Sequence, residues 1–180
     1  MSKFLRYAVA GAAVASFGIA SGAQAATTAQ ANATAEILSS LAVAVDTTAN
    51  TLDFGTIADG GIAGDTAVVV AVDASVTCGA SLTCAGTPAV PLFHVTGAAD
   101  KAVNISFANL SETLTYVGTP PTGFASNTLT ASSFVTDATS DQVVLTSGAA
   151  DFSVGGTLTV HADQAPGVYT GTLGVSVAYN

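Results

Sequence analysis

The sequence predicts an all-β sandwich, and three features of the chain point to it. Short alternating or β-branched apolar stretches recur along the chain, and clusters of Gly, Pro, Asp and Ser separate them. No stretch after residue 25 shows a convincing helical pattern. Many short strands with regular turns are typical of a β-sandwich. Between the two ends of the chain, the predicted strands are 52–57, 68–76, 90–96, 102–107, 112–117, 128–135, 142–146 and 156–161.

Residues 1–25 have the three parts of an export signal. Lys3 and Arg6 form a charged start, residues 7–20 are apolar but short for a bilayer span, and Ala23-Gln24-Ala25 is a small-x-small cleavage site. We therefore expect export through the periplasm and a mature chain that begins at Ala26. No later stretch is long and apolar enough to predict a membrane helix. The expected organisation is a signal peptide at 1–25, an extension at 26–38 and one domain at 39–180.

The mature chain is strongly acidic. Lys101 is its only Lys or Arg, and twelve Asp and Glu give it a net charge of −11. Nucleic-acid binding requires cations that replace the counterions of the phosphates, so the composition argues against it. Binding to anionic lipid is disfavoured for the same reason.

The last fourteen residues, GVYTGTLGVSVAYN, alternate between apolar and small or polar residues. Side chains two apart in a strand share a face, so the odd positions predict the core side of a final strand. These positions are Gly167, Tyr169, Gly171, Leu173, Val175, Val177 and Tyr179. On this evidence alone, the segment can be the last strand of any complete β-sandwich.

The segment also resembles the C-terminal motif of subunits of chaperone–usher pili. That motif has a glycine fourteen residues from the end and a penultimate tyrosine, and Gly167 and Tyr179 occupy both positions. The resemblance implies an immunoglobulin-like β-sandwich that lacks one strand. It implies that the N-terminal extension of the next subunit fills the gap, after a periplasmic chaperone and an outer-membrane usher have handled the subunit.

A second alternating run lies near the mature N-terminus, within residues 26–45. Its second half, 39–45, predicts the first strand of the domain, and its first half is a spare strand. The pilin resemblance makes this half a donor strand, with groove-filling residues Ala29, Ala31, Ala33, Ala35 and Ile37. Only Ile37 is large, and full burial of such a side chain is worth about 2 kcal/mol. The alternative is a loosely held N-terminal tail.

The two cysteines, Cys78 and Cys84, lie close together in an exported chain. This predicts one disulfide that closes a strand–loop–strand corner, worth about 2 kcal/mol in the chain-entropy description. The alternative is a metal site, but two sulfurs without a nearby histidine are a poor ligand set for zinc.

Most of the mature chain is also similar to a bacterial exported family of unknown function. The similar segments are Leu52-Asp53-Phe54-Gly55, Phe93 to Gly97, Val154 to Val160 and Gly167 to Gly171. The likeness of that family to pilins implies a fold more than a function.

Residues with catalytic potential are few. His94 and His161 lie in predicted strands, and no nucleophile elbow or calcium-loop spacing accompanies them. We therefore expect no enzymatic activity, no cofactor and no metal. A hydrolase is the function that the sequence favours least.

We expect a structural subunit of an extracellular surface filament that polymerises with identical copies by donor-strand exchange and supports adhesion or biofilm formation. The alternative is a monomeric secreted or cell-surface β-sandwich that serves as a binding or coat protein.

Overall fold

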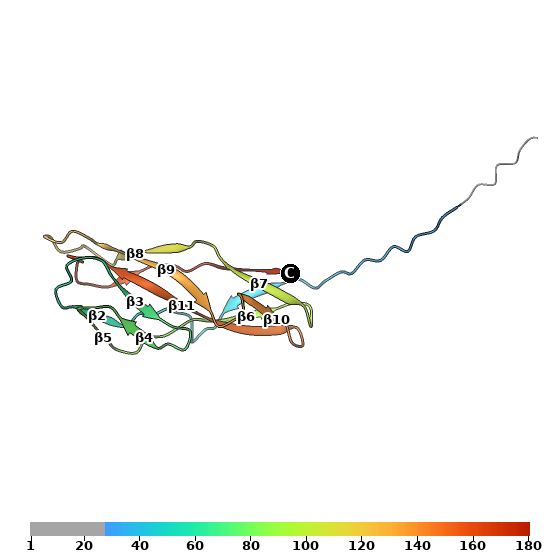
Figure 1. Ribbon diagram of the computed structural model, residues 1–180, viewed down its shortest axis with the longest axis horizontal. Coiled ribbons are helices and arrows are strands. Elements are labelled where there is room, and N and C mark those ends of the chain that lie inside the picture. The colour runs from blue at the N-terminus through green and yellow to red at the C-terminus, as the bar shows by residue number, and fades with distance from the viewer. Residues whose placement is uncertain (1–27) are drawn as a thin grey trace, which may run out of the picture. The chain divides into compact units, whose positions relative to one another are not determined.

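The computed structural model describes residues 28–180. It separates into two units at residue 36, and the unit 37–180 contains all the described secondary structure. This unit is all-β, which confirms the predicted fold class (Figure 1). The predicted signal peptide at 1–25 lies outside the described residues. The strands are β1 (Ala42–Val45), β2 (Thr56–Asp59), β3 (Thr66–Val70), β4 (Val76–Cys78), β5 (Leu82–Ala85), β6 (Leu92–Thr96), β7 (Ala102–Phe107), β8 (Ser111–Tyr116), β9 (Thr128–Thr136), β10 (Gln142–Val144), β11 (Ala149–Val160), β12 (Tyr169–Thr170) and β13 (Val175–Tyr179).

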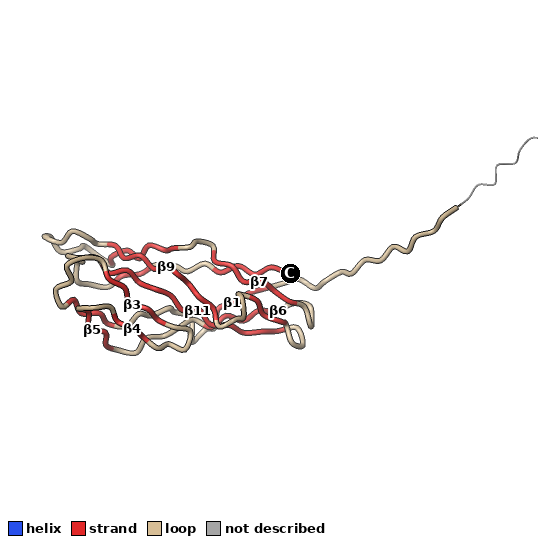
Figure 2. The backbone as a smooth tube through the Cα atoms, in the orientation of Figure 1, coloured by secondary structure: helices blue, strands red, loops and turns tan. Residues whose placement is uncertain are grey.

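The strands form three antiparallel sheets. The largest has the order β1-β6-β11-β9-β8-β12, with β3 paired to β11 and β4 paired to β3. A second sheet has the order β10-β7-β13, and β2 pairs with β5 in a two-stranded ribbon. Figure 2 shows strands alternating with loops and turns throughout the unit, with no helix among the described residues.

Strand β11 is the longest and connects two parts of the largest sheet. Its first half pairs with β6, and its second half pairs with β3 and β9. The change of partner occurs at Gly155 and Gly156, where the register with β9 shifts. A Cβ atom on Gly155 would lie 2.5 Å from the carbonyl oxygen of Val70, so the close approach of β3 requires a glycine there.

Two buried clusters follow from this arrangement, one at each end of β11. The first lies between the largest sheet and the β2–β5 ribbon, with Phe54, Val68, Val70, Leu129, Ala131, Leu158 and Val160 at its centre. The second lies between β1-β6-β11 and β10-β7-β13, with Phe93, Val95, Val103, Ile105, Leu145, Phe152 and Val154 at its centre. In Figure 1 the β2–β5 ribbon lies toward one pole of the unit, and β7, β10 and the C-terminus lie toward the other.

Several predicted strands differ from those observed. The stretch 68–76 is divided, because Asp73 accepts the amide of Ser75 and Ala74 takes a positive φ of 62°, which makes a turn between β3 and β4. The predicted strand 52–57 is not continuous, because Asp53 forms only an isolated bridge with Ala89 and β2 begins at Thr56. The strand predicted at 156–161 begins earlier, since β11 starts at Ala149.

Candidate assembly groove

The C-terminal segment is an edge strand with an interruption. Its first part, β12, pairs with β8, and its second part, β13, pairs with β7 from Val175 opposite Phe107 to Tyr179 opposite Val103. Residues 171–174 between them are not in strand, which corrects the expected continuous strand. Both β12 and β13 are the last strands of their sheets, so each has an outer backbone edge without a paired strand among the described residues.

The alternation predicted for this segment is present in its burial. Even positions from Val168 to Asn180 are exposed except Gly174, whereas five of the predicted core-side residues are half-buried. Gly167 and Gly171 are exposed. The half-buried residues contact the two clusters and are Tyr169, Leu173, Val175, Val177 and Tyr179. The core is therefore only partly covered along this edge.

The chain that faces this edge is residues 45–57. It begins at the end of β1, which is itself the first strand of the largest sheet. Two adjoining cavities, of about 360 and 590 Å³, lie between residues 45–57 and residues 164–173. Both cavities are lined by Thr51, Leu52, Leu114 and Tyr169, so together they form one groove. We call the smaller cavity the narrow pocket and the larger one the wide pocket.

Core side chains form the floor of the groove. Phe93, Ala131 and Phe134 line the narrow pocket, while Phe54, Leu129, Leu158 and Val160 line the wide pocket. Polar side chains also line the groove, with Asn50 and Glu112 in the narrow pocket and Asp53, Asp59 and Gln164 in the wide pocket. The Nε2 of Gln164 donates to the hydroxyl of Tyr169 at 2.7 Å. The groove thus has an apolar floor, some polar lining groups and β-strand backbone beside it, a combination that suits an extended peptide.

Tyr179 closes the sandwich beyond one end of the groove. Its hydroxyl accepts a hydrogen bond from the amide of Ala98 at 2.6 Å and donates one to the carbonyl of Ser39 at 3.0 Å. A side chain on Gly97 would overlap this hydroxyl, so glycine is needed at that position. The penultimate tyrosine therefore fixes the chain just before β1 to the last strand. The sequence pointed to Tyr179 and placed Gly97 in a family-like segment, but it gave no indication that Gly97 and Ser39 contact the tyrosine hydroxyl.

Gly167 lies at the opposite end of the groove, beside the wide pocket. A Cβ atom on Gly167 would overlap the ring of Tyr116, which packs edge-on against Tyr169 with ring centroids 5.4 Å apart. The Tyr116 hydroxyl donates to the carbonyl of Pro166 at 3.2 Å. Glycine at this position therefore lets an aromatic ring lie across the start of the last strand. We refer to the two ends of the unit as the Tyr179 pole and the Gly167 pole.

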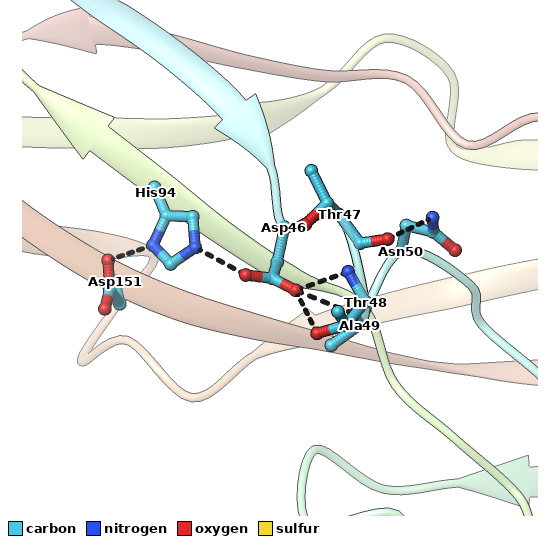
Figure 3. A network of polar contacts seen from close by, with 7 residues as sticks. All are labelled: Asp46, Thr47, Thr48, Ala49, Asn50, His94 and Asp151. Carbon is cyan, nitrogen blue, oxygen red and sulfur yellow. Dashed lines mark hydrogen bonds and ion pairs between the residues drawn. The ribbon is translucent and has the colours of Figure 1, made fainter.

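A histidine between two carboxylates stabilises the turn that follows β1 (Figure 3). His94 of β6 contacts Asp46 through Nε2 at 3.1 Å and Asp151 through Nδ1 at 2.7 Å. The hydrogen bond to Asp151, then the one to Asp46, raises the pKa of His94 above its ordinary value of 6.5. The protonated ring donates from both nitrogens at once.

Asp46 also organises the turn itself. Its Oδ1 accepts from the Thr48 amide at 2.7 Å, the Thr48 hydroxyl at 2.6 Å and the Ala49 amide at 2.8 Å, as Figure 3 shows. These bonds, led by the Thr48 hydroxyl, hold the pKa of the Asp46 carboxyl well below its usual range. Residues Asn50, Thr51 and Leu52, directly after this turn, line the narrow pocket. The cluster therefore positions one wall of the groove, and His94 has a structural role.

The predicted disulfide between Cys78 and Cys84 is present, with Cα atoms 5.9 Å apart. Cys78 ends β4 and Cys84 lies in β5, so the bond connects the largest sheet to the β2–β5 ribbon. The ribbon covers the cluster beneath the wide pocket. The disulfide thus secures one side of the groove.

The predicted donor residues lie outside any strand. Ala29, Ala31, Ala33, Ala35 and Ile37 are all exposed, and Ile37 is 96% exposed. Leu38 is half-buried, and Ser39 is held by Tyr179. The described chain thus carries a stretch with alternating exposed alanines that forms no strand, followed by a segment that is anchored to the folded unit through Ser39.

Other polar chemistry is limited within residues 28–180. His161 Nδ1 lies 3.0 Å from Asp65, far along the chain from His94. No group of three or more His, Cys, Asp or Glu residues in this part of the chain is arranged to hold a metal ion. No helix in the same range is long and apolar enough to cross a membrane.

Comparison with known proteins gives one match. Residues 43–179 match a family described as a domain of unknown function (DUF4402). The chain belongs to this family. No curated protein and no solved structure matches the chain. The DUF4402 match begins within β1 and ends at Tyr179, so it contains both walls of the groove and excludes the exposed extension.

Proposed function

We propose that the protein is a structural subunit of an extracellular surface filament, built from identical copies by donor-strand exchange. In this process the N-terminal extension of one copy lies as a strand in the groove of the next. One observation carries the proposal, namely an apolar groove along an unpaired edge strand in a chain that also has an exposed strand-like extension. Adhesion or biofilm formation is the expected role of such a filament.

Strand addition suits the groove because an added strand gains backbone hydrogen bonds and buries apolar side chains at the same time. A strand beside residues 167–173 satisfies free amide and carbonyl groups, each worth about 0.5–1.5 kcal/mol net when paired. Its inward side chains cover core residues such as Phe134, Leu114 and Tyr169, which are only half-buried. Four alanines bury little apolar area, so backbone pairing supplies a large share of the binding energy.

The geometry favours a polar filament. The extension joins the unit at the Tyr179 pole, where Ser39 is held, whereas the wide pocket lies at the Gly167 pole. A donor that leaves one pole of a copy and enters the other pole of the next makes a heterologous contact, which repeats without closing into a dimer. In this arrangement the donor runs antiparallel to the C-terminal strand.

An open edge strand over apolar core is prone to aggregate before assembly. A periplasmic chaperone that covers the groove, and an outer-membrane usher that exchanges it for a donor, are therefore the proposed partners. The route is export by the predicted signal at 1–25, passage through the periplasm and display at the cell surface. The disulfide is consistent with an oxidising compartment.

A second candidate is a monomeric secreted or cell-surface β-sandwich that binds a ligand or forms a coat. It is favoured by the Tyr179 pole, where β1 and β13 approach each other and Tyr179 bonds Ser39, so the sandwich is closed there without a donor. In this case the groove is a binding cleft and the extension is a tail.

One gel separates the two candidates. Material sheared from the cell surface is run in detergent with and without boiling. A filament gives a ladder in the unheated lane that collapses to one band on boiling, because dissociation requires a whole strand to unpair. Deletion of residues 26–37 removes the donor and abolishes the ladder, while the shortened subunit still accumulates with its chaperone. A single monomer band in both wild-type lanes, or a normal ladder from the deletion, contradicts the filament proposal.

A further inference from the structure

Ile37 stands at the point where the chain leaves the folded unit. Leu38 is half-buried and the carbonyl of Ser39 is bonded to Tyr179, whereas Ile37 is 96% exposed. Ile37 is therefore the first large apolar residue, counted outward from β1, whose side chain lies outside its own core. It is also the only large apolar side chain among residues 28–37.

The anchoring of Leu38 and Ser39 limits how far Ile37 can reach. A strand advances about 3.3 Å per residue, so one or two residues separate Ile37 from the surface of its own copy. If two copies are arranged head to tail, Ile37 of one reaches only the nearest mouth of the groove in the next. That mouth is at the Gly167 pole, where the wide pocket opens beside Val168.

The wide pocket has the size and chemistry for such a side chain. Its volume is about 590 Å³, against about 360 Å³ for the narrow pocket, and its floor is formed by Phe54, Leu129, Leu158 and Val160. Val168 at its rim is 66% exposed, an apolar side chain left in solvent in the isolated unit. Residues two apart on a strand share a face about 6.6 Å apart, so alanines 35, 33 and 31 would follow toward the narrow pocket.

We infer that Ile37 of one copy is the anchor residue that enters the wide pocket of the next copy, while the alanines of the extension pass through the narrow pocket. This assignment rests on the proposed donor-strand function and deepens it, because it fixes the register and makes the single isoleucine the determinant of fit. Tyr179 acts as a positioning residue, since its bond to Ser39 sets where Ile37 leaves the unit.

Engineered cysteines test the register directly. The double variant Ile37→Cys/Val168→Cys places one sulfur on the anchor and one at the pocket rim, on residues that are exposed in the isolated unit. After oxidation of assembled material, we expect a ladder that survives boiling without reductant and collapses with it. The control is Ile37→Cys/Val135→Cys, because Val135 of β9 is 49% exposed but does not line the groove. Equal cross-linking in both variants, or none in a variant that polymerises normally, overturns the assignment.

An exchange of residues within the extension provides the second test. The variant Ile37→Ala/Ala33→Ile keeps the composition and hydrophobicity of the donor but moves its large side chain toward the narrow pocket. Both positions are exposed, so folding of the subunit should be unchanged. We expect the heat-sensitive ladder to be lost or to collapse at a lower temperature than wild type. A ladder with wild-type heat resistance contradicts the inference. Absence of a ladder from the wild type itself contradicts the proposed function instead, so the two failures are distinguishable.

Discussion

Replacement of Tyr179 by phenylalanine removes one oxygen atom and leaves the ring in place. That oxygen bonds the amide of Ala98 at 2.6 Å and the carbonyl of Ser39 at 3.0 Å, and both partners lie at the Tyr179 pole. Each hydrogen bond is worth about 0.5–1.5 kcal/mol net, so the variant should lose about 1–3 kcal/mol of unfolding free energy. For a domain of this size, about 1 kcal/mol corresponds to about 2–4 °C in Tm.

Thermal unfolding of the purified protein, followed by circular dichroism, measures the effect. Wild type and variant must be compared in the same oligomeric state, because assembly itself raises apparent stability. The matched control is Tyr116→Phe, which loses one longer hydrogen bond to Pro166 and should shift the Tm less. If Tyr179→Phe and Tyr116→Phe both leave the Tm within about 1 °C of wild type, the hydrogen bonds of Tyr179 do not stabilise this end of the sandwich, and the reasoning is wrong.

Three further predictions follow from the groove and its walls. Stability should be highest between about pH 4 and 6.5. The raised pKa of His94 adds stability that is fully present below pH 6.5 and is lost as the pH rises. The lowered pKa of Asp46 adds stability that is fully present above pH 3.8 and is lost as the pH falls. Tm measured from about pH 2 to 9 should show both losses, and His94→Gln should flatten the alkaline side. Gly167→Ala should lower the unfolding free energy by about 1–3 kcal/mol, because the methyl group displaces the ring of Tyr116; denaturant unfolding that matches wild type excludes this clash. Reduction of the Cys78–Cys84 disulfide should remove about 2 kcal/mol, measured by denaturant unfolding with and without reductant.

The strands that could be predicted are those whose pattern is local. Residues 102–107 alternate with turn residues on both sides, and β7 has those bounds. The alternation of 167–180 also predicted which side chains face the core, since Val175 and Val177 are half-buried and Ser176 is exposed. The disulfide could be predicted because the two cysteines are the only pair and lie six residues apart.

Other features depend on contacts between distant residues and left no local signal. The strand predicted at 156–161 missed the first half of β11, because that half is set by pairing with β6, which extends the strand back to Ala149. The role of Gly97 depends on the hydroxyl of Tyr179, which is far away in the sequence. The groove itself exists only because residues 45–57 and 164–173 face each other in the folded unit.

The single strand β11 has a mechanical consequence. It spans both buried clusters, pairing with β6 at one end and with β3 and β9 at the other. In a filament of these subunits, tension enters at the Tyr179 pole through the donor strand and leaves at the Gly167 pole through the groove. This force runs along the strands, so the hydrogen bonds of β11 are loaded together in shear rather than opened one at a time. Resistance to forced unfolding depends on the unfolding rate, and because one continuous strand is shared by both clusters, neither cluster can be pulled from the other without loading β11.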